Sequence, residues 1–363
     1  MRDLQDLSDL GQLVDHRRII VCCGSGGVGK TTTAAAIALA GARRGKRACV
    51  VTIDPAKRLA DALGLESLTN KPGRIAGDWP GELWALMLDT KSTFDDLVQR
   101  YSGSPQQAAG ILENRLYRNI SGALSGTQEY MAMEKLYELH AEGNFDLVVV
   151  DTPPTRNALD FLDAPRRLTR FLDNRIFRML MMPTRAYLRA VSVATQAFLR
   201  TISKVVGGDV VKDAVAFFNA FEGMEQGFRE RAQRVLELLS EPGTAFVLVA
   251  SPRRDAVDEA LFFARKLAES DIAVQGLVVN RVHPRYGPVP DGPELAGPAA
   301  RSGPLASLLA NLGDLQGIAE REESHFAALA AQVAPAPVVR VPFLADDVHD
   351  VTGLDIIGRY LFA

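Results

Sequence analysis

Apolar runs of strand length recur along the chain, and longer segments of helical spacing separate them. The runs are continuous in Val, Leu, Ile and Ala, which is typical of strands buried on both faces of a parallel sheet. Their alternation with helices predicts an α/β fold with a doubly wound, mostly parallel sheet. The predicted strands are residues 17–23, 47–53, 83–88, 145–150, 244–250, 272–279 and 337–341.

Two stretches interrupt this alternation and predict an inserted α-helical subdomain. Residues 90–142 are expected to form several short helices, and residues 160–239 a longer helical block. In the second block, methionines and aromatic residues recur at helical spacing between arginines, which indicates an amphipathic helix with an adaptable apolar face. Two interpretations stay open: the face packs as core, or it forms a groove for a client or partner. The methionines are Met179, Met181, Met182 and, further along, Met224.

The nine residues 24–32 read GSGGVGKTT, a complete phosphate loop between a predicted strand and a predicted helix over 31–44. Its glycines allow backbone conformations in which successive N–H groups turn inward around phosphate oxygens. Lys30 would bridge the β- and γ-phosphates, the Thr31 hydroxyl would hold Mg²⁺, and the helix N-terminus adds its positive dipole end. The sequence therefore predicts a binding site for a nucleoside triphosphate.

Polar side chains follow the ends of the other predicted strands, where ligands bind in open sheets of this class. Asp151 follows four apolar residues, an arrangement in which the carboxylate holds the Mg²⁺ shell; a helix-capping role is the alternative. Asp54 has the same ambiguity. Ser251 and Pro252 are predicted as the N-cap and first residue of a helix. The candidate positions beyond the phosphate loop are Asp54, Asp151, Ser251, Arg253, Asn280, Pro342 and Phe343.

Length and composition predict one large domain over residues 1–363 that carries the two helical insertions. Residues 284–304 contain ten Pro or Gly residues in 21, which predicts a flexible loop. A net charge of −3 disfavours a nucleic-acid surface. No apolar run reaches the roughly 18 residues of a membrane span, and no signal peptide is evident, so we expect a cytoplasmic protein.

The three cysteines, Cys22, Cys23 and Cys49, lie on predicted strands without a C-x-x-C pair. They are expected to be buried thiols in a reducing compartment. The sequence therefore predicts no thiolate cluster for a metal.

Five segments in order resemble the arsenical-pump and tail-anchored-protein-targeting ATPases, a family related to the septum-placement, plasmid-partition and nitrogenase-iron-protein ATPases. The phosphate loop and its helix resemble the opening of that family, TIDPAKRLADALG its first switch, and DTPPTRNALDFLDAP its second switch. VVNRV and RVPFLADDVHDVTGLDII resemble its adenine-side segments. The resemblance covers most of the chain.

The resemblance implies an Mg²⁺-dependent ATPase in which ATP closes two subunits face to face. It implies that Asp54 activates the attacking water and that Asp151 supports the metal and senses the γ-phosphate, with Lys30, Asp54 and Asp151 as the catalytic set. Thr31, Asp54 and Asp151 would surround Mg²⁺, and Asn280, Pro342 and Phe343 would contact adenine. The helices after the second switch would correspond to a client-binding subdomain. The implied phosphate contacts are Gly26, Gly27, Val28, Gly29, Lys30, Thr31 and Thr32.

Two departures from the family pattern change what the resemblance implies. Ser25 stands where the family has a lysine that reaches the partner's phosphates. Lys57 or Arg58 could compensate, a lysine-bearing homologue could supply the charge in a heterodimer, which we favour over a homodimer, or turnover could be slow. The second departure is the absence of both the zinc-binding C-x-x-C pair and a thiol cluster for arsenite, which disfavours an arsenite pump.

Three functional classes remain. The helical block favours an ATP-driven chaperone or targeting switch with a hydrophobic client. A partition-type positioning ATPase at a membrane or protein surface is the alternative, but such proteins carry a basic membrane helix or basic DNA surface, whereas this chain ends GLDIIGRYLFA. A metabolic kinase or ligase would show a compact substrate pocket in place of the helical block.

Overall fold

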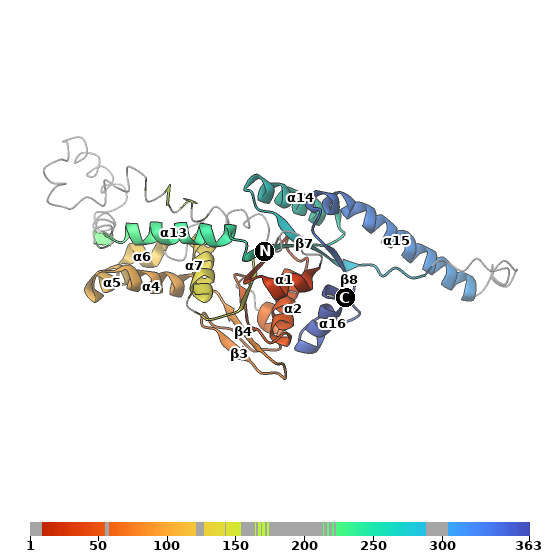
Figure 1. Cartoon of the computed structure of the whole chain (residues 1–363), viewed down its shortest axis with the longest axis horizontal. Coiled ribbons are helices and arrows are strands. Elements are labelled where there is room, and N and C mark those ends of the chain that lie inside the picture. Colours follow the sequence, from red (N-terminus) through yellow and green to blue (C-terminus); the bar gives the residue numbers. More distant parts are fainter. Residues whose placement is uncertain are drawn as a thin grey trace.

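A computed structural model describes residues 9–54, 58–120, 127–141, 143–153, 223–287 and 304–363, with isolated positions between 164 and 220. The described residues form one eight-stranded sheet in the order β3-β4-β2-β5-β1-β6-β7-β8 (Figure 1). Neighbouring strands are parallel except β3 and β4, which are antiparallel. The strands are β1 Ile19–Cys23, β2 Arg47–Thr52, β3 Gly73–Ile75, β4 Glu82–Met87, β5 Leu147–Asp151, β6 Thr244–Ala250, β7 Val274–Val282 and β8 Val338–Pro342.

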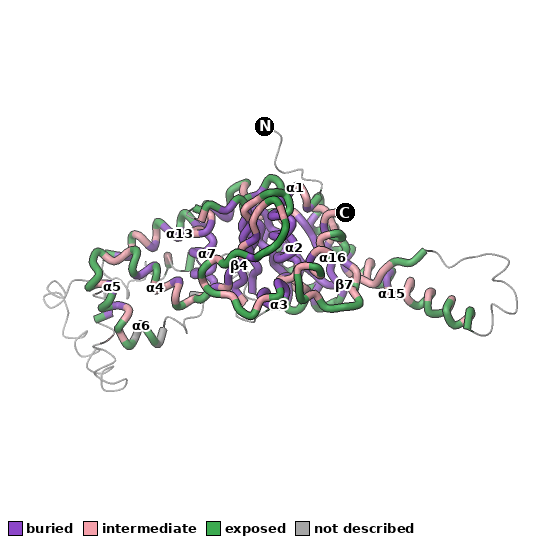
Figure 2. Tube along the Cα trace, turned by 90° about the horizontal axis from the view of Figure 1, so that it is seen from below, coloured by how far each residue is buried: buried purple, intermediate pink, exposed green. Residues whose placement is uncertain are grey.

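Helices cover both faces of the sheet, so the doubly wound α/β fold is confirmed. One hydrophobic cluster joins the sheet to α1, α2, α3 and α16, and a second joins it to α4, α5, α7, α13, α14 and α15. Buried residues concentrate in the strands and α2 (Figure 2). The helices are α1 Leu10–His16, α2 Lys30–Arg43, α3 Arg58–Ala62, α4 Thr90–Tyr101, α5 Pro105–Leu112, α6 Arg115–Ile120, α7 Thr127–Ala141, α13 Glu225–Ser240, α14 Arg254–Glu269, α15 Pro304–Val333 and α16 Val351–Leu361.

The strands at the middle of the sheet are buried on both faces, as the continuous apolar runs predict. Every residue of β1, β5 and β6 is buried. All seven predicted strands are present, with ends displaced by at most three residues. The three cysteines lie on β1 and β2 as free, buried thiols. The antiparallel edge strand β3 and helix α1 were not predicted, because a three-residue strand and a seven-residue helix carry too little periodicity.

The predicted cap of the helix after β6 is wrong. Helix α14 begins at Arg254, with Arg253 in the N-cap position and no side-chain cap. Ser251 and Pro252 are buried at the sheet edge, and Arg253 is the first exposed residue. The helix begins only after the chain has left the buried edge of the sheet. Burial of Ser251 and Pro252 therefore overrides their local preference for a helix N-terminus.

The long helix α15 begins at Pro304, where the Pro/Gly-rich loop was predicted to end. Most of that loop, residues 288–303, lies outside the described residues, as do Met179, Met181 and Met182. Met224 is 1% exposed, and its sulfur accepts a hydrogen bond from the Ser102 hydroxyl at 3.7 Å, so this methionine is part of the hydrophobic core. Among the described helices, none combines the length and apolarity that a membrane crossing needs.

Helices α4 to α7 and α13 lie together at one end of the molecule, and α15 projects at the opposite end (Figure 1). A buried ion pair joins α13 to α7: Arg231 Nε donates to Glu134 at 2.8 and 2.9 Å, and both side chains are at most 5% exposed. The guanidinium also lies 3.7 Å from the centre of the Tyr137 ring. The pair fixes the register of two helices that are almost a hundred residues apart in sequence.

We expect Glu134→Leu to lower the free energy of unfolding by about 3–5 kcal/mol, because it leaves the Arg231 charge buried and without its carboxylate. The double variant Glu134→Leu/Arg231→Met should lose clearly less, since it removes both charges and keeps the apolar volume. Urea unfolding of both variants measures the difference. Equal losses would show that the helices depend on side-chain shape and not on charge balance.

Candidate functional site

The phosphate loop connects β1 to α2, as predicted, and two of its glycines have left-handed backbone. Gly27 and Gly29 have φ values of 76° and 96°. A Cβ on Gly29 would lie 2.1 Å from the Asn280 amide nitrogen, so only glycine fits there. The Asn280 amide donates to the Val28 carbonyl at 2.8 Å. Strand β7 therefore holds the loop in shape through Asn280.

Lys30, the first residue of α2, is buried beneath the loop with only 7% of its surface exposed. Its ammonium group donates to the Ser25 carbonyl at 2.8 Å. Burial lowers the pKa of Lys30, and the nearby Asp151 carboxylate partly opposes that shift. A desolvated ammonium whose contact is a neutral carbonyl suits an anionic ligand.

Asp151 ends the buried strand β5 at the centre of the sheet. Its Oδ2 atom accepts hydrogen bonds from the hydroxyls of Thr31, at 2.7 Å, and Thr52, at 2.9 Å. Its Oδ1 atom is buried and has no hydrogen-bond partner among the described residues. Burial raises the pKa of Asp151 to about 6, although both threonine bonds act in the opposite direction. The helix-capping alternative does not fit a carboxylate that contacts two threonine side chains on other elements.

Asp54 lies just beyond the end of β2, on the same side of the site. Its amide donates to the Thr52 hydroxyl at 3.2 Å, and its carboxylate lies 3.7 Å from the Arg58 guanidinium. The Asp54 side chain is 23% exposed and that of Arg58 is 61% exposed. Lys57, the other predicted substitute for the missing lysine, lies outside the described residues.

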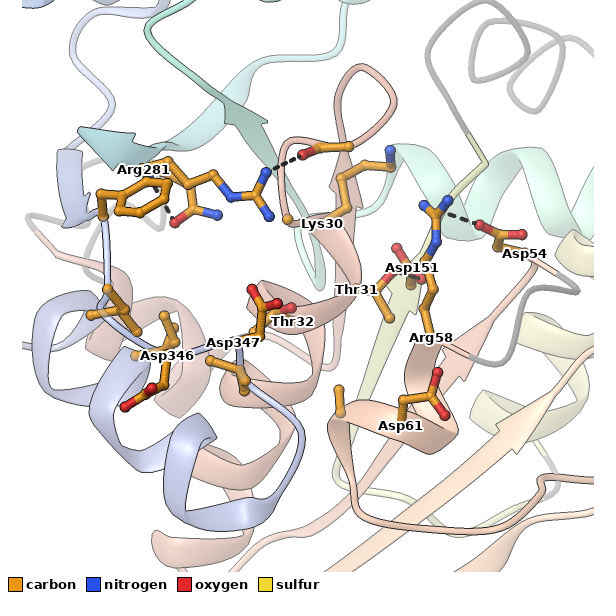
Figure 3. A pocket seen from close by; sticks show the side chains of 18 of the residues that line it. Lys30, Thr31, Thr32, Asp54, Arg58, Asp61, Asp151, Arg281, Asp346 and Asp347 are labelled. Carbon is orange, nitrogen blue, oxygen red and sulfur yellow. Dashed lines mark hydrogen bonds and ion pairs between the residues drawn. The ribbon is translucent and has the colours of Figure 1, made fainter. Parts of the chain in front are cut away.

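A cavity of about 590 Å³ brings most of the predicted residues together (Figure 3). The phosphate loop forms one wall, Asp54 and Asp151 a second, and the ends of β7 and β8 a third. Phe343 is 61% exposed there, and its amide donates to the Val282 carbonyl at 2.8 Å. The predicted residues that line the cavity are Gly27, Gly29, Lys30, Thr31, Thr32, Asp54, Asp151, Asn280, Pro342 and Phe343.

The remaining predicted positions lie outside the lining. Gly26 is exposed, and Val28 is buried with its carbonyl accepting the hydrogen bond from Asn280. Arg253 forms an ion pair with Asp255 at 2.6 Å. Ser251 is buried at the end of β6, outside the lining.

Four charged residues of the lining were not predicted as site residues: Asp61, Arg281, Asp346 and Asp347. Three of them lie within four residues after a predicted position, and this proximity in sequence could have identified them. Arg281 comes after Asn280, and the two aspartates follow Phe343 within four residues.

The residues present fit a nucleoside triphosphate with Mg²⁺. The loop supplies a cradle that a Cβ at Gly29 would fill, and the buried ammonium of Lys30 lies behind it. Asp151 offers a free, buried carboxylate oxygen beside the Thr31 hydroxyl, and such hard oxygen donors suit Mg²⁺.

The pKa of Asp151 predicts how the stability of the protein without nucleotide depends on pH. The folded-state pKa of about 6 exceeds the unfolded value of 3.8, so the native state holds this proton more tightly. The proton on Asp151 therefore stabilises the native state fully below the unfolded pKa, and this contribution to the free energy of unfolding is lost as pH rises through 6. It amounts to about 3 kcal/mol. Asp151→Asn should therefore be more stable than the wild type above pH 6 by about 1–3 kcal/mol.

The advantage of Asp151→Asn should vanish near pH 4, where the wild-type carboxyl is protonated. Chemical unfolding of both proteins across pH 4 to 8, without nucleotide or Mg²⁺, measures it. A stability difference between the two proteins that does not change with pH would contradict the raised pKa of Asp151.

Comparisons with known proteins agree with this geometry. The model of the anion-transporting ATPase family matches residues 17–287. An Aquifex aeolicus protein named arsenical pump-driving ATPase 1 is 23% identical over 354 residues, which cover 95% of this chain and 78% of that protein. The ATPase get3 of Schizosaccharomyces japonicus is 26% identical over 262 residues, covering 71% and 72%. An uncharacterized protein of Streptomyces coelicolor is 30% identical over 285 residues, covering 78% and 67%.

The family match spans the loop, both aspartates and Asn280, while Pro342 and Phe343 lie beyond it. Together with the doubly wound sheet and the phosphate loop at its centre, it shows that this chain belongs to the anion-transporting ATPase family.

Proposed function

We propose that this chain binds ATP with Mg²⁺ in the cavity, hydrolyses it, and uses the nucleotide state to control a helical surface for a hydrophobic partner. One observation carries the proposal. Asp151 is held between Thr31 and Thr52 with a buried oxygen left over, next to a buried lysine of a phosphate loop. Such a pair of desolvated opposite charges suits a metal ion bound to phosphates.

Each residue has a role that follows from its position. Lys30 would exchange the Ser25 carbonyl for phosphate oxygens, and the loop N–H groups would bind the others. The Thr31 hydroxyl and the Asp151 carboxylate would hold Mg²⁺, which supplies positive charge to the phosphates. Asp54, more exposed than Asp151, would orient the attacking water and accept its proton.

The ends of β7 and β8 would bind the base. The Asn280 side chain already donates to Val28 and accepts from the Arg281 amide at 3.0 Å, so it positions the loop. Pro342 and the exposed ring of Phe343 offer the apolar surface against which adenine would lie.

A chain of contacts supports coupling between the site and the helical end of the molecule. Gln128, near the start of α7, donates to the Ile53 carbonyl at 3.0 Å, directly before Asp54. Helix α7 is joined to α13 by the buried pair of Glu134 and Arg231. A displacement of the Asp54 segment on nucleotide binding would therefore move α7 and α13 together.

The thiols of this chain support a role other than arsenite transport. Burial raises the pKa of Cys22, Cys23 and Cys49. A thiolate is the form that binds soft metals and metalloids. Thiols that stay protonated on β1 and β2 are poor ligands for As(III).

The assembly we propose pairs two subunits when ATP is bound. Ser25 is 4% exposed and its hydroxyl has no hydrogen-bond partner within the described part of the chain. It cannot replace a lysine that reaches across an interface. A lysine-bearing homologue in a heterodimer is one source of the missing charge, and another cation of this chain is the second.

Asp54→Asn should reduce the turnover number for ATP by about 10²–10⁴-fold, because the amide cannot accept the proton of the attacking water. ATP affinity should stay within a few-fold of the wild type, because the phosphate contacts are unchanged. Phosphate release and ATP titration measure the two quantities. Asp258→Asn, an exposed change on α14, is the matched control. Equal turnover in both variants would remove Asp54 from the mechanism.

The molecular mass in solution tests the assembly. Asp54→Asn, which is expected to bind ATP and hydrolyse it slowly, should form dimers with ATP and Mg²⁺ and revert to monomers with ADP, as followed by light scattering. A monomer under all conditions that dimerises only with a lysine-bearing homologue would establish the heterodimer. Homodimers would show that this chain supplies its own charge.

A further inference from the structure

We propose that Arg281 is the second cation of the phosphate site and binds the terminal phosphates of ATP in place of the lysine that Ser25 replaces. The inference rests on the proposed function, because it assigns a phosphate contact within the same cavity. Four features of the backbone and side chain carry it.

Arg281 lies at a β-bulge. The pairing of β7 with β8 shifts its register between Asn280 and Val282, so Arg281 has no counterpart on β8. A bulge bends the strand and changes the direction of one side chain. The preceding residue, Asn280, is buried, whereas Arg281 is exposed and lines the cavity.

The backbone of Arg281 is in the left-handed region, with φ of 65°. This conformation is uncommon and unfavourable for a residue with a long side chain. The Asn280 side chain holds it by accepting a hydrogen bond from the Arg281 amide at 3.0 Å. The same Asn280 amide binds Val28 of the loop, so Arg281 and the phosphate loop are fixed to one side chain.

The Arg281 guanidinium reaches the loop and donates to the Gly27 carbonyl at 3.2 Å (Figure 3). Apart from Gly27 itself and its two chain neighbours, none of the described residues has an atom within 4 Å of the position a Cβ on Gly27 would take, so this side of the loop is open. Lys30 approaches the loop from its buried side, through Ser25. A guanidinium has five N–H donors, and the bond to Gly27 leaves others for phosphate oxygens.

The alternative cation, Arg58, is less suited to this role. It lies across the cavity from Arg281, beside the Asp54 carboxylate (Figure 3). That carboxylate compensates part of its charge. Among the described residues, no carboxylate lies within ion-pair distance of Arg281, whose contact is a neutral carbonyl. Its positive charge is therefore available to an anion.

A cation at this position should favour ATP over ADP, because it would bind the phosphates farthest from the nucleoside. Arg281→Asn removes the charge and keeps a residue type that tolerates left-handed backbone. It should weaken ATP binding by about 10–100-fold, with ADP binding changed by less than about threefold. The turnover number should fall by about 10³-fold, as when an arginine finger is removed. Isothermal titration with both nucleotides, in Mg²⁺, and phosphate release measure these effects.

Three further variants make the experiment specific. Arg281→Lys keeps the charge and should retain ATP preference over ADP. Ser25→Lys in the Arg281→Asn background should restore turnover at least tenfold, because it returns a cation to the loop. Arg253→Asn is the matched control, because Arg253 is an exposed arginine outside the cavity, at an N-cap position where Asn is favoured. It should change the binding of neither ATP nor ADP.

The results separate the inference from the function on which it rests. Equal weakening of ATP and ADP in Arg281→Asn, with a lower unfolding temperature, would show that Arg281 only supports the loop and would overturn the inference. Unchanged binding and turnover would overturn it as well, while ATP hydrolysis by the wild type stands. A wild type that binds neither nucleotide would overturn both.

Discussion

The site depends on a carboxylate buried at the centre of the sheet. Asp151 ends β5 between β1 and β2, and hydroxyls from α2 and β2 hold one of its oxygens. Burying this charge is unfavourable, which is why its pKa rises. The neighbouring strands are apolar and mostly buried, so the carboxylate meets the cavity with only 1% of its surface exposed. A charge kept at such a position indicates a ligand and not a contribution to stability.

The surrounding elements are arranged around that charge. β1 leads into the phosphate loop, β2 leads to Asp54, and β7 supplies Asn280, which fixes the loop through Val28. Parallel strands make this convergence possible because their carboxyl ends share one edge. The left-handed Gly29 lets the Asn280 amide approach at a distance that any other residue would block. The geometry of the loop therefore depends on a residue about 250 positions later.

The sequence predicts the parts of this arrangement that are local. Continuous Val and Leu runs predict buried strands, and the spacing of the loop predicts its position before α2. Asp151 was predicted from the four apolar residues before it. The cap at Ser251 was wrong because burial at the sheet edge delayed the helix, which no local pattern reveals. Asn280 was expected to contact adenine, which stays a prediction; its hydrogen bond to Val28 of the loop was not predicted, because it is a long-range contact.

Arg281 shows why part of a site cannot be predicted from a strand pattern. In a regular strand it would point to the face opposite Asn280, since side chains alternate. Its direction toward the loop follows from a register shift against β8, a strand some sixty residues later, and from a left-handed φ. Neither the register shift nor the left-handed φ can be recognised in the local sequence, because Asn-Arg-Val is compatible with a regular strand. Only the paired sheet shows that the residue after Asn280 faces the phosphate loop.

Lys30 and Asp151 show how burial of charged groups favours a ligand at this site. Burial shifts both pKa values toward the neutral form, downward for the lysine and upward for the aspartate. The two groups influence each other electrostatically, but each hydrogen-bonds to other partners, Lys30 to a carbonyl and Asp151 to hydroxyls. Phosphate oxygens would compensate the first and a divalent cation the second, so metal and nucleotide together would remove a cost that neither removes alone. A ligand that relieves a cost of the native state stabilises it in proportion to its affinity. The same desolvation that destabilises the protein without nucleotide would thus favour cooperative binding of nucleotide and Mg²⁺.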